Sequence, residues 1–91
     1  MKFLTGTLVA TRGIHFDMIE SPEFRKEIDQ SLTKYLNCDW GDTCEADKPL
    51  NDEAVQNGER ILAAYETSKG KIWIITEWDR SATTILYPDE Y

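Results

Sequence analysis

The feature that most constrains the fold is the apolar run Ile-Trp-Ile-Ile at residues 72–75, inside the longer segment 71–78. β-branched and aromatic residues are typical of a strand, and here they occupy both alternating faces. A strand that is apolar on both faces is expected at the centre of a sheet, covered from both sides. The chain is therefore expected to build a sheet around residues 71–78.

Two further strands are predicted beside this one, at residues 60–67 and 82–87. Residues 68–70 predict a turn, because Gly70 accepts a positive φ without strain. Residues 79–81 predict a second turn, and Pro88 is expected to end the last strand. The C-terminal half is thus predicted to be a three-strand antiparallel meander.

The N-terminal third predicts one strand and one long helix. Residues 3–11 predict a strand at an edge of the sheet or inside it, and residues 14–19 a short extended piece or a connector. Ser21 and Pro22 are a strong helix start, as N-cap and first helical residue. Asn37 is expected to end this helix. Its apolar stripe consists of Phe24, Ile28, Leu32, Tyr35 and Leu36.

A shorter helix is predicted from Asn51 or Asp52 to Asn57, with Gly58 just after its end. Residues 1–91 are therefore expected to form a single α+β domain. Its small antiparallel sheet, the N-terminal strand plus the C-terminal meander, would pack against one main helix and one short helix. A chain of 91 residues has a small core, but 41% apolar residues argue against disorder.

Nearly all of the net charge of −7 lies in residues 37–59. Seven acidic side chains stand there against the single basic residue Lys48, which leaves six net negative charges. Such a local field repels nucleic acid and attracts a basic partner or a cation. The seven are Asp39, Asp42, Glu45, Asp47, Asp52, Glu53 and Glu59.

Three interpretations of this acidity are open: a cation site, a solvated surface, and a recognition surface for a basic protein. Ca²⁺ and Mg²⁺ require several oxygen ligands, and the spacing here does not match a calcium-binding hand loop. On a recognition surface the carboxylates would take the place of phosphates and pair with Arg or Lys. Because the charge is concentrated, we favour recognition. The candidate partner-binding residues are Asp39, Trp40, Asp42, Glu45, Asp47, Asp52 and Glu53.

Two other residue types in this segment have open interpretations. Trp40 either packs against the main helix or stands exposed as an interface anchor. Cys38 and Cys44 match no zinc or redox spacing, so two free thiols are expected, with a short-loop disulfide as the alternative. No cofactor or metal is expected.

A second polar group lies at the predicted turn around residues 77–81. An enzyme could use Glu77 and Asp79 as a carboxylate pair with Arg80 as an anchor, and His15 as acid or base if the fold brings it near. In the structural interpretation these are ordinary turn residues. Arg80 or Arg60 would then brace the acidic segment from inside.

Several functional classes are not supported by the sequence. The five glycines are isolated, so no phosphate-binding loop is present, and one histidine offers no credible catalytic triad. Without a basic stripe, direct binding of nucleic acid is not expected. No apolar run reaches the about 20 residues that span a bilayer, and the N-terminus makes a poor signal peptide. A cytoplasmic location is therefore expected.

Residues 38–91 resemble a family of small uncharacterised proteins carried by bacterial plasmids and integrated elements, some of them labelled plasmid-related proteins. The resemblance rests on CDWGD at 38–42, LND at 50–52, GERILAAY at 58–65, WIITEWDRSATTIL at 73–86 and PDEY at 88–91. The family usually has Ala where this chain has Trp78. The resemblance implies a mobile-element setting, where small acidic proteins often act against host defence.

The predicted function is that of a small acidic, non-enzymatic binding protein of a mobile element. It would inhibit a host nucleic-acid-handling defence complex, of the restriction or CRISPR type, by occupying a channel that selects the phosphate backbone. One alternative is a small enzyme with its carboxylate and Arg site at residues 77–80. The other is a homo-oligomeric regulatory protein, such as a homodimer, joined through a strand edge.

Overall fold

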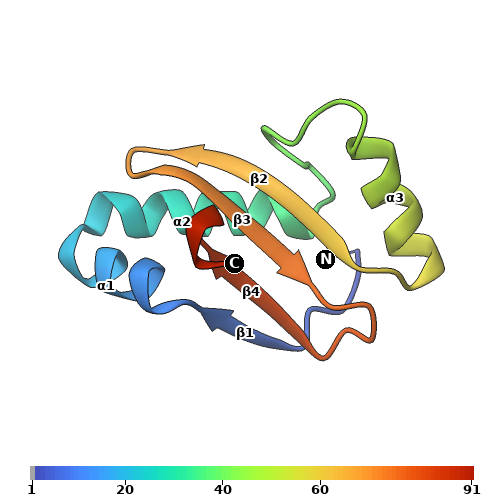
Figure 1. Cartoon of the computed structure of the whole chain (residues 1–91), viewed down its shortest axis with the longest axis horizontal. Helices are drawn as coiled ribbons and strands as arrows, with labels where there is room; N and C mark the ends of the chain where they lie inside the picture. The colour runs from blue at the N-terminus through green and yellow to red at the C-terminus, as the bar shows by residue number, and fades with distance from the viewer. Residues whose placement is uncertain (1) are drawn as a thin grey trace.

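A four-stranded sheet is the central element of the structure, which is a computed structural model that describes residues 2–91 (Figure 1). The strands are β1 (Thr7–Ala10), β2 (Ile61–Thr67), β3 (Gly70–Thr76) and β4 (Ala82–Leu86), in the spatial order β1-β4-β3-β2. β2, β3 and β4 form the predicted antiparallel meander, with Ile74 opposite Ala63 on one side and Ile85 on the other. The apolar run at residues 72–75 therefore lies in an inner strand, as predicted.

The N-terminal strand corrects the predicted sheet topology. β1 pairs with β4 in parallel, from Thr7 opposite Ala82 to Ala10 opposite Ile85, so the sheet is mixed and not fully antiparallel. Only four of the residues expected in this strand join the ladder. The chain leaves β1 through two helices and returns to its side only at β4, and this long crossover permits the parallel pairing.

Three helices pack with the sheet, where two were predicted. They are α1 (Arg12–Glu20), α2 (Pro22–Leu36) and α3 (Lys48–Asn57). The prediction of an extended piece or a connector at residues 14–19 is wrong, because these residues belong to α1. A carboxylate from the other end of the chain supplies the missing helix start: Glu90 accepts hydrogen bonds from the Gly13 N–H at 3.0 Å and the Thr11 hydroxyl at 2.6 Å. Such an anion at a helix N-terminus is stabilising.

The other two helices follow their local signals. Ser21 Oγ accepts the Phe24 N–H at 3.1 Å, and α2 ends at Asn37 as predicted. α3 begins earlier than predicted, at Lys48, because Pro49 is well suited to its first turn. It ends at Gly58, whose φ of 68° is the left-handed conformation that favours glycine. No helix among residues 2–91 combines the length and the apolar character that crossing a membrane requires.

The core lies between α2 and the sheet (Figure 1), and it contains a buried chain of hydroxyl groups. Tyr35 of α2 shares a hydrogen bond of 2.6 Å with Thr76 of β3, which shares one of 2.7 Å with Thr83 of β4. Thr83 donates to the Thr5 carbonyl at 2.8 Å. Burial raises the pKa of Tyr35 well above its ordinary value, so its hydroxyl stays protonated. These bonds connect four segments of the chain through the core.

The face of the sheet away from α2 is partly covered by the C-terminus (Figure 1). Pro88 ends β4 and begins a short 3-10 helix, η1 (Pro88–Glu90). Tyr91 then lies edge-on to Trp73, with 5.8 Å between the ring centroids, and the Arg60 guanidinium lies 5.3 Å from the centre of the Tyr91 ring. β3 is therefore covered on both faces, which accounts for its doubly apolar sequence.

Candidate functional site

The acidic segment, residues 37–59, lies along the outer edge of β2 and ends in α3 at one end of the molecule (Figure 1). Its loop forms an isolated parallel bridge between Gly41 and Ala64. Within that bridge the Asp42 N–H donates to the Ala64 carbonyl at 2.9 Å, and the Ala64 N–H donates to Thr43 Oγ1 at 2.9 Å. The Asp42 carboxylate accepts the Glu66 N–H at 2.9 Å. The loop therefore occupies hydrogen-bonding groups that an edge strand would otherwise expose.

Together with the loop, Asn51 in the first turn of α3 covers the hydrogen-bonding groups of the β2 edge; we call this cover the edge cap. The side-chain amide of Asn51 donates to the Leu62 carbonyl at 2.9 Å and accepts the Leu62 N–H at 3.3 Å. An amide side chain carries the same donor and acceptor as a peptide group, so Asn51 substitutes for a residue of a neighbouring strand. Only 6% of Asn51 is exposed, which places this contact inside the joint between α3 and the sheet.

Trp40 fastens the segment to the core. It is only 3% exposed, and its ring centroid lies 5.6 Å from that of Tyr35 and 6.4 Å from that of Phe3. The indole N–H donates to the Asp52 carboxylate at 2.8 Å, which connects the loop to α3. The packed interpretation of Trp40 is therefore correct, and the interpretation as an exposed partner-binding anchor is wrong for this structure.

The residue after Trp40 explains the Trp-Gly sequence. Gly41 has a φ of 58°, and a Cβ at this position would collide with the Tyr65 ring. Tyr65 in turn donates its hydroxyl to the Asp39 carbonyl at 2.7 Å. Only glycine lets the loop approach β2 this closely.

Arg80 is the brace that the sequence predicted inside the acidic segment. From the turn between β3 and β4, its guanidinium donates to the carbonyls of Ala54 at 2.8 Å and Glu59 at 2.6 Å. It also donates to the carbonyl of Glu77 at 3.1 Å, within its own turn. Ala54 lies in the last turn of α3 and Glu59 just beyond the helix, so the guanidinium stands at the C-terminal end of α3, where a cation is favourable. Arg60, the other candidate, forms an exposed ion pair with Glu77 at 3.6 Å, which adds little stability.

The structure divides the seven acidic side chains into two groups. Three of them accept hydrogen bonds that fix the segment: Asp39 from the Gly41 N–H at 3.1 Å, together with Asp42 and Asp52 as described above. All seven residues are exposed, but the remaining four, which we call the outward carboxylates, accept no hydrogen bond from the backbone or from Trp40. The outward carboxylates are Glu45, Asp47, Glu53 and Glu59.

Most of the outward carboxylates have no partner within residues 2–91. Glu45 forms an exposed ion pair with Lys48 at 2.9 Å, and this contact is the main cause of the raised pKa of Lys48. The carboxylates of Asp47, Glu53 and Glu59 accept no hydrogen bond and form no ion pair within the described chain. The segment thus combines a fixed backbone with carboxylates that are free to bind something else.

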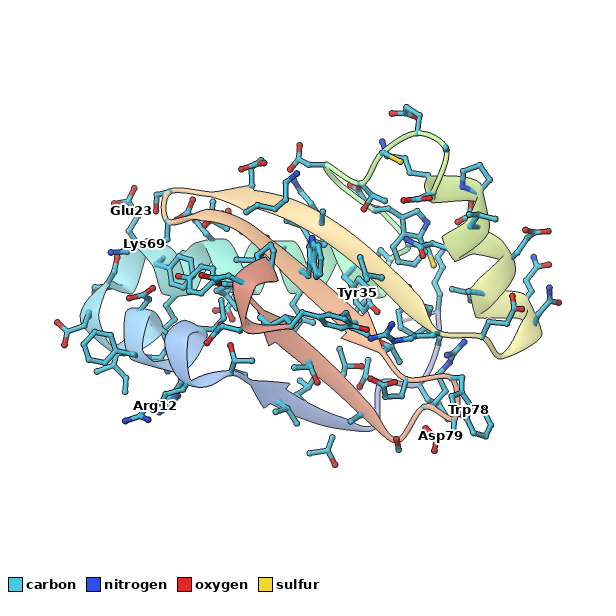
Figure 2. The ribbon with its side chains drawn as sticks, viewed as in Figure 1. Arg12, Glu23, Tyr35, Lys69, Trp78 and Asp79 are labelled. Atoms are coloured by element: carbon cyan, nitrogen blue, oxygen red, sulfur yellow. The ribbon has the colours of Figure 1, made fainter. Side chains whose placement is uncertain are left out.

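Trp78 is a candidate contact residue that was not predicted, because its position falls inside the predicted central strand, residues 71–78. It is 67% exposed in the turn that follows β3, between Glu77 and Asp79 (Figure 2). The Asp79 carboxylate accepts the Ser81 N–H at 3.0 Å. Hydrogen bonding from Ser81, first from its side chain and then from its backbone N–H, lowers the pKa of Asp79. Since Arg80 joins the turn to α3, Trp78 is presented beside the C-terminal end of the acidic segment. Its position between the acidic residues Glu77 and Asp79 is the feature of the sequence that could have indicated an exposed Trp.

The alternative enzyme site does not assemble. Arg80 is engaged by backbone carbonyls, Glu77 pairs with Arg60, and Asp79 fixes its own turn. His15 belongs to α1, which lies at the opposite end of the molecule from the β3–β4 turn (Figure 1). The polar residues of the turn therefore have the structural roles that the second interpretation gave them.

The metal-ligating residue types do not gather in the described chain. Across residues 2–91 there is no cluster of three or more His, Cys, Asp or Glu side chains arranged to hold a metal ion. Cys38 and Cys44 are both free thiols; Cys38 is half-buried and Cys44 exposed. Burial raises the pKa of the Cys38 thiol, which lowers its reactivity.

Comparison of the chain with models of protein families, with curated proteins and with solved structures finds no match. The resemblance of residues 38–91 to plasmid-related proteins, and the mobile-element setting that it implies, therefore stay predictions. The fold and the geometry of the site define an α+β protein with an acidic segment mounted on a sheet edge.

Proposed function

We propose that this chain is a small non-enzymatic binding protein whose outward carboxylates dock on a basic surface of a protein partner. One observation carries the proposal: the outward carboxylates stand on a backbone that is hydrogen-bonded to β2 and braced by Arg80. A surface that is ordered before binding loses little conformational entropy when the partner arrives. Acidic residues that served only solubility would not need such a framework.

The chemistry of the surface suggests the class of partner. Carboxylates pair with Arg and Lys, and Arg binds them through two parallel hydrogen bonds. α3 has ten residues and is therefore about 15 Å long. Asp47 and Glu59 flank it, so the negative charge extends over roughly four steps of a DNA strand at about 3.4 Å each. Channels that hold nucleic acid bind its negatively charged backbone through Lys and Arg.

The partner class that fits is a nucleic-acid-handling defence complex of a host, of the restriction or CRISPR type. The protein would occupy the channel for DNA or RNA and block its substrate. Trp78 would add an aromatic anchor at the end of the acidic surface, where it can stack on an Arg side chain. The mobile-element setting that the resemblance implies agrees with this role.

The test is inhibition of DNA cleavage by purified restriction and CRISPR effector complexes. We expect the protein to inhibit at least one complex, and the variant E45K/D47K/E53K to lose about 100-fold in inhibition if each lost pair contributes about 1 kcal/mol. The matched control E20K/D29K/D89K makes the same change in net charge at exposed residues outside the acidic segment. This control should inhibit like the natural sequence.

Two results would contradict the proposal. Equal loss in both variants would mean that net charge, and not the acidic segment, is responsible. The absence of inhibition in every complex, together with no captured basic partner from a bacterial host, would reject the partner class. Circular dichroism of each variant shows whether its fold is intact.

A further inference from the structure

The two edges of the sheet differ in how their backbone hydrogen-bonding groups are covered. The β2 edge is covered by the acidic segment, but β1 has a neighbour on one side only. The Thr7 N–H donates at 3.1 Å to the carbonyl of Ser81, just before β4, and the Thr11 N–H donates at 3.0 Å to the carbonyl of Ile85 in β4. Backbone groups of successive strand residues point to opposite edges, so Leu8 and Ala10 direct theirs away from the sheet. Within residues 2–91 these outward groups form no hydrogen bond.

The β1 edge is short, but it lacks two other common protections of an edge strand. Its sequence, TLVA, contains no charge and no proline, which are the common means of keeping another strand away. Leu8 is 53% exposed and Val9 42% exposed. Of the eight large apolar side chains that are exposed in residues 2–91, five lie near this edge in sequence. They are Leu4, Leu8, Val9, Phe16 and Ile19.

We propose that β1 pairs antiparallel with β1 of a second copy of this chain, which makes one continuous eight-stranded sheet. The register that uses every outward group of β1 places Leu8 opposite the partner's Ala10, where the two residues exchange both N–H to carbonyl hydrogen bonds. The same pairing holds in reverse, so each interface contains four backbone hydrogen bonds. Val9 then lies opposite the Val9 of the partner subunit, on the two-fold axis.

Charge favours a second copy as the occupant of this edge. Residues 2–20 contain two basic and two acidic side chains, so this part of a chain with net charge −7 is neutral. In the paired sheet the two β2 edges would be seven strand spacings apart, about 34 Å at roughly 4.8 Å each. This exceeds the Debye length of about 8 Å at physiological salt, so the two acidic segments would hardly repel each other. Both outward carboxylate surfaces stay free.

The first experiment is sedimentation equilibrium of the full chain over a range of concentrations. We expect a dimer with a Kd on the order of 10 μM, as suits a small interface. V9K places two like charges together on the two-fold axis, and A10P removes an outward donor at a position where an edge strand tolerates proline. Both variants should sediment as folded monomers. The control L50K changes a similarly exposed apolar residue on α3 and should remain a dimer.

A cross-link tests the register. In a C38S/C44S background, V9C should form a disulfide-linked dimer on oxidation, because non-hydrogen-bonded antiparallel pairs bring their Cβ atoms close. L50C in the same background should not. A monomer at all concentrations overturns the proposal, and so does a dimer that V9K and A10P leave unchanged. A different partner on this edge would appear as a monomer that neither variant alters. None of these outcomes bears on the acidic surface.

Discussion

Asn51 offers the sharpest test of how the acidic segment is held. Its side chain is the only group that occupies both the N–H and the carbonyl of Leu62 in the described chain, at 3.3 and 2.9 Å. The substitution Asn51→Ala leaves a good helix residue in α3, so the propensity of the helix does not suffer. It removes the two hydrogen bonds and leaves the Leu62 peptide groups without a protein partner.

The expected loss of unfolding free energy follows from the burial of the contact between Asn51 in α3 and Leu62 in β2. A buried backbone group that loses its partner costs about 1–3 kcal/mol, and a group that water can reach costs less. Leu62 is half-buried, so we take about 1–2 kcal/mol for each of its two groups. Asn51→Ala should therefore lower the free energy of unfolding by about 2–4 kcal/mol, a large part of the stability of a small domain.

Urea denaturation at neutral pH measures this loss, and NMR hydrogen exchange of the Leu62 amide localises it. The matched control is Gln56→Ala, an exposed position on the same helix, which should change stability by less than about 0.5 kcal/mol. If Asn51→Ala also changes the free energy of unfolding by less than about 0.5 kcal/mol, and its Leu62 amide exchanges as slowly as in the natural sequence, the role of Asn51 in the edge cap is refuted.

Three further substitutions probe the framework by urea denaturation. Glu90→Gln should destabilise α1 by about 1 kcal/mol. Hydrogen bonds, first from Thr11, lower the pKa of Glu90 in the folded chain. The stability difference between the variant and the natural sequence should therefore be complete above pH 4.5 and vanish as the pH falls through the lowered pKa. Tyr35→Phe should cost about 1 kcal/mol, since Thr76 keeps its second hydroxyl partner. Arg80→Ala should cost about 2–3 kcal/mol and speed hydrogen exchange in α3 more than in α2; uniform exchange would contradict the brace.

The parts of the fold that were predictable from sequence are those with local signals. The N-cap Ser21 and an apolar stripe define α2 almost to the residue, and Gly58 and Gly70 mark a helix end and a turn through their positive φ. The doubly apolar run at residues 72–75 identified the inner strand, because its composition reports the cover on both faces.

The incorrect predictions, of α1 and of the pairing of β1, have one physical cause: both features depend on residues far away in the sequence. α1 was missed because its N-terminal carboxylate, Glu90, lies 77 residues from Gly13. The parallel pairing of β1 depends on Thr7 and Thr11 meeting β4 at the other end of the chain. No local pattern of residues contains either contact.

The candidate site was predictable in place but not in detail. Charge counting located the acidic segment and its size. The sequence does not distinguish Asp42 and Asp52, which fix the segment, from the outward carboxylates. Asp42 accepts a hydrogen bond from Glu66 and Asp52 accepts one from Trp40, and both contacts form only in the folded chain. The exposure of two tryptophans was also not predictable: Trp40, a candidate partner-binding residue, is buried, and Trp78, placed in the predicted central strand, is exposed.

The central claim is that the acidic segment is a fixed surface and not a mobile charged loop. Backbone ¹⁵N relaxation of the amides of Gly41, Asp42 and Thr43 tests it directly, because all three donate hydrogen bonds in the structure. We expect order parameters of about 0.85, equal to those of β2 and β3. Values below about 0.6 at these three amides, beside a rigid sheet, would contradict the account.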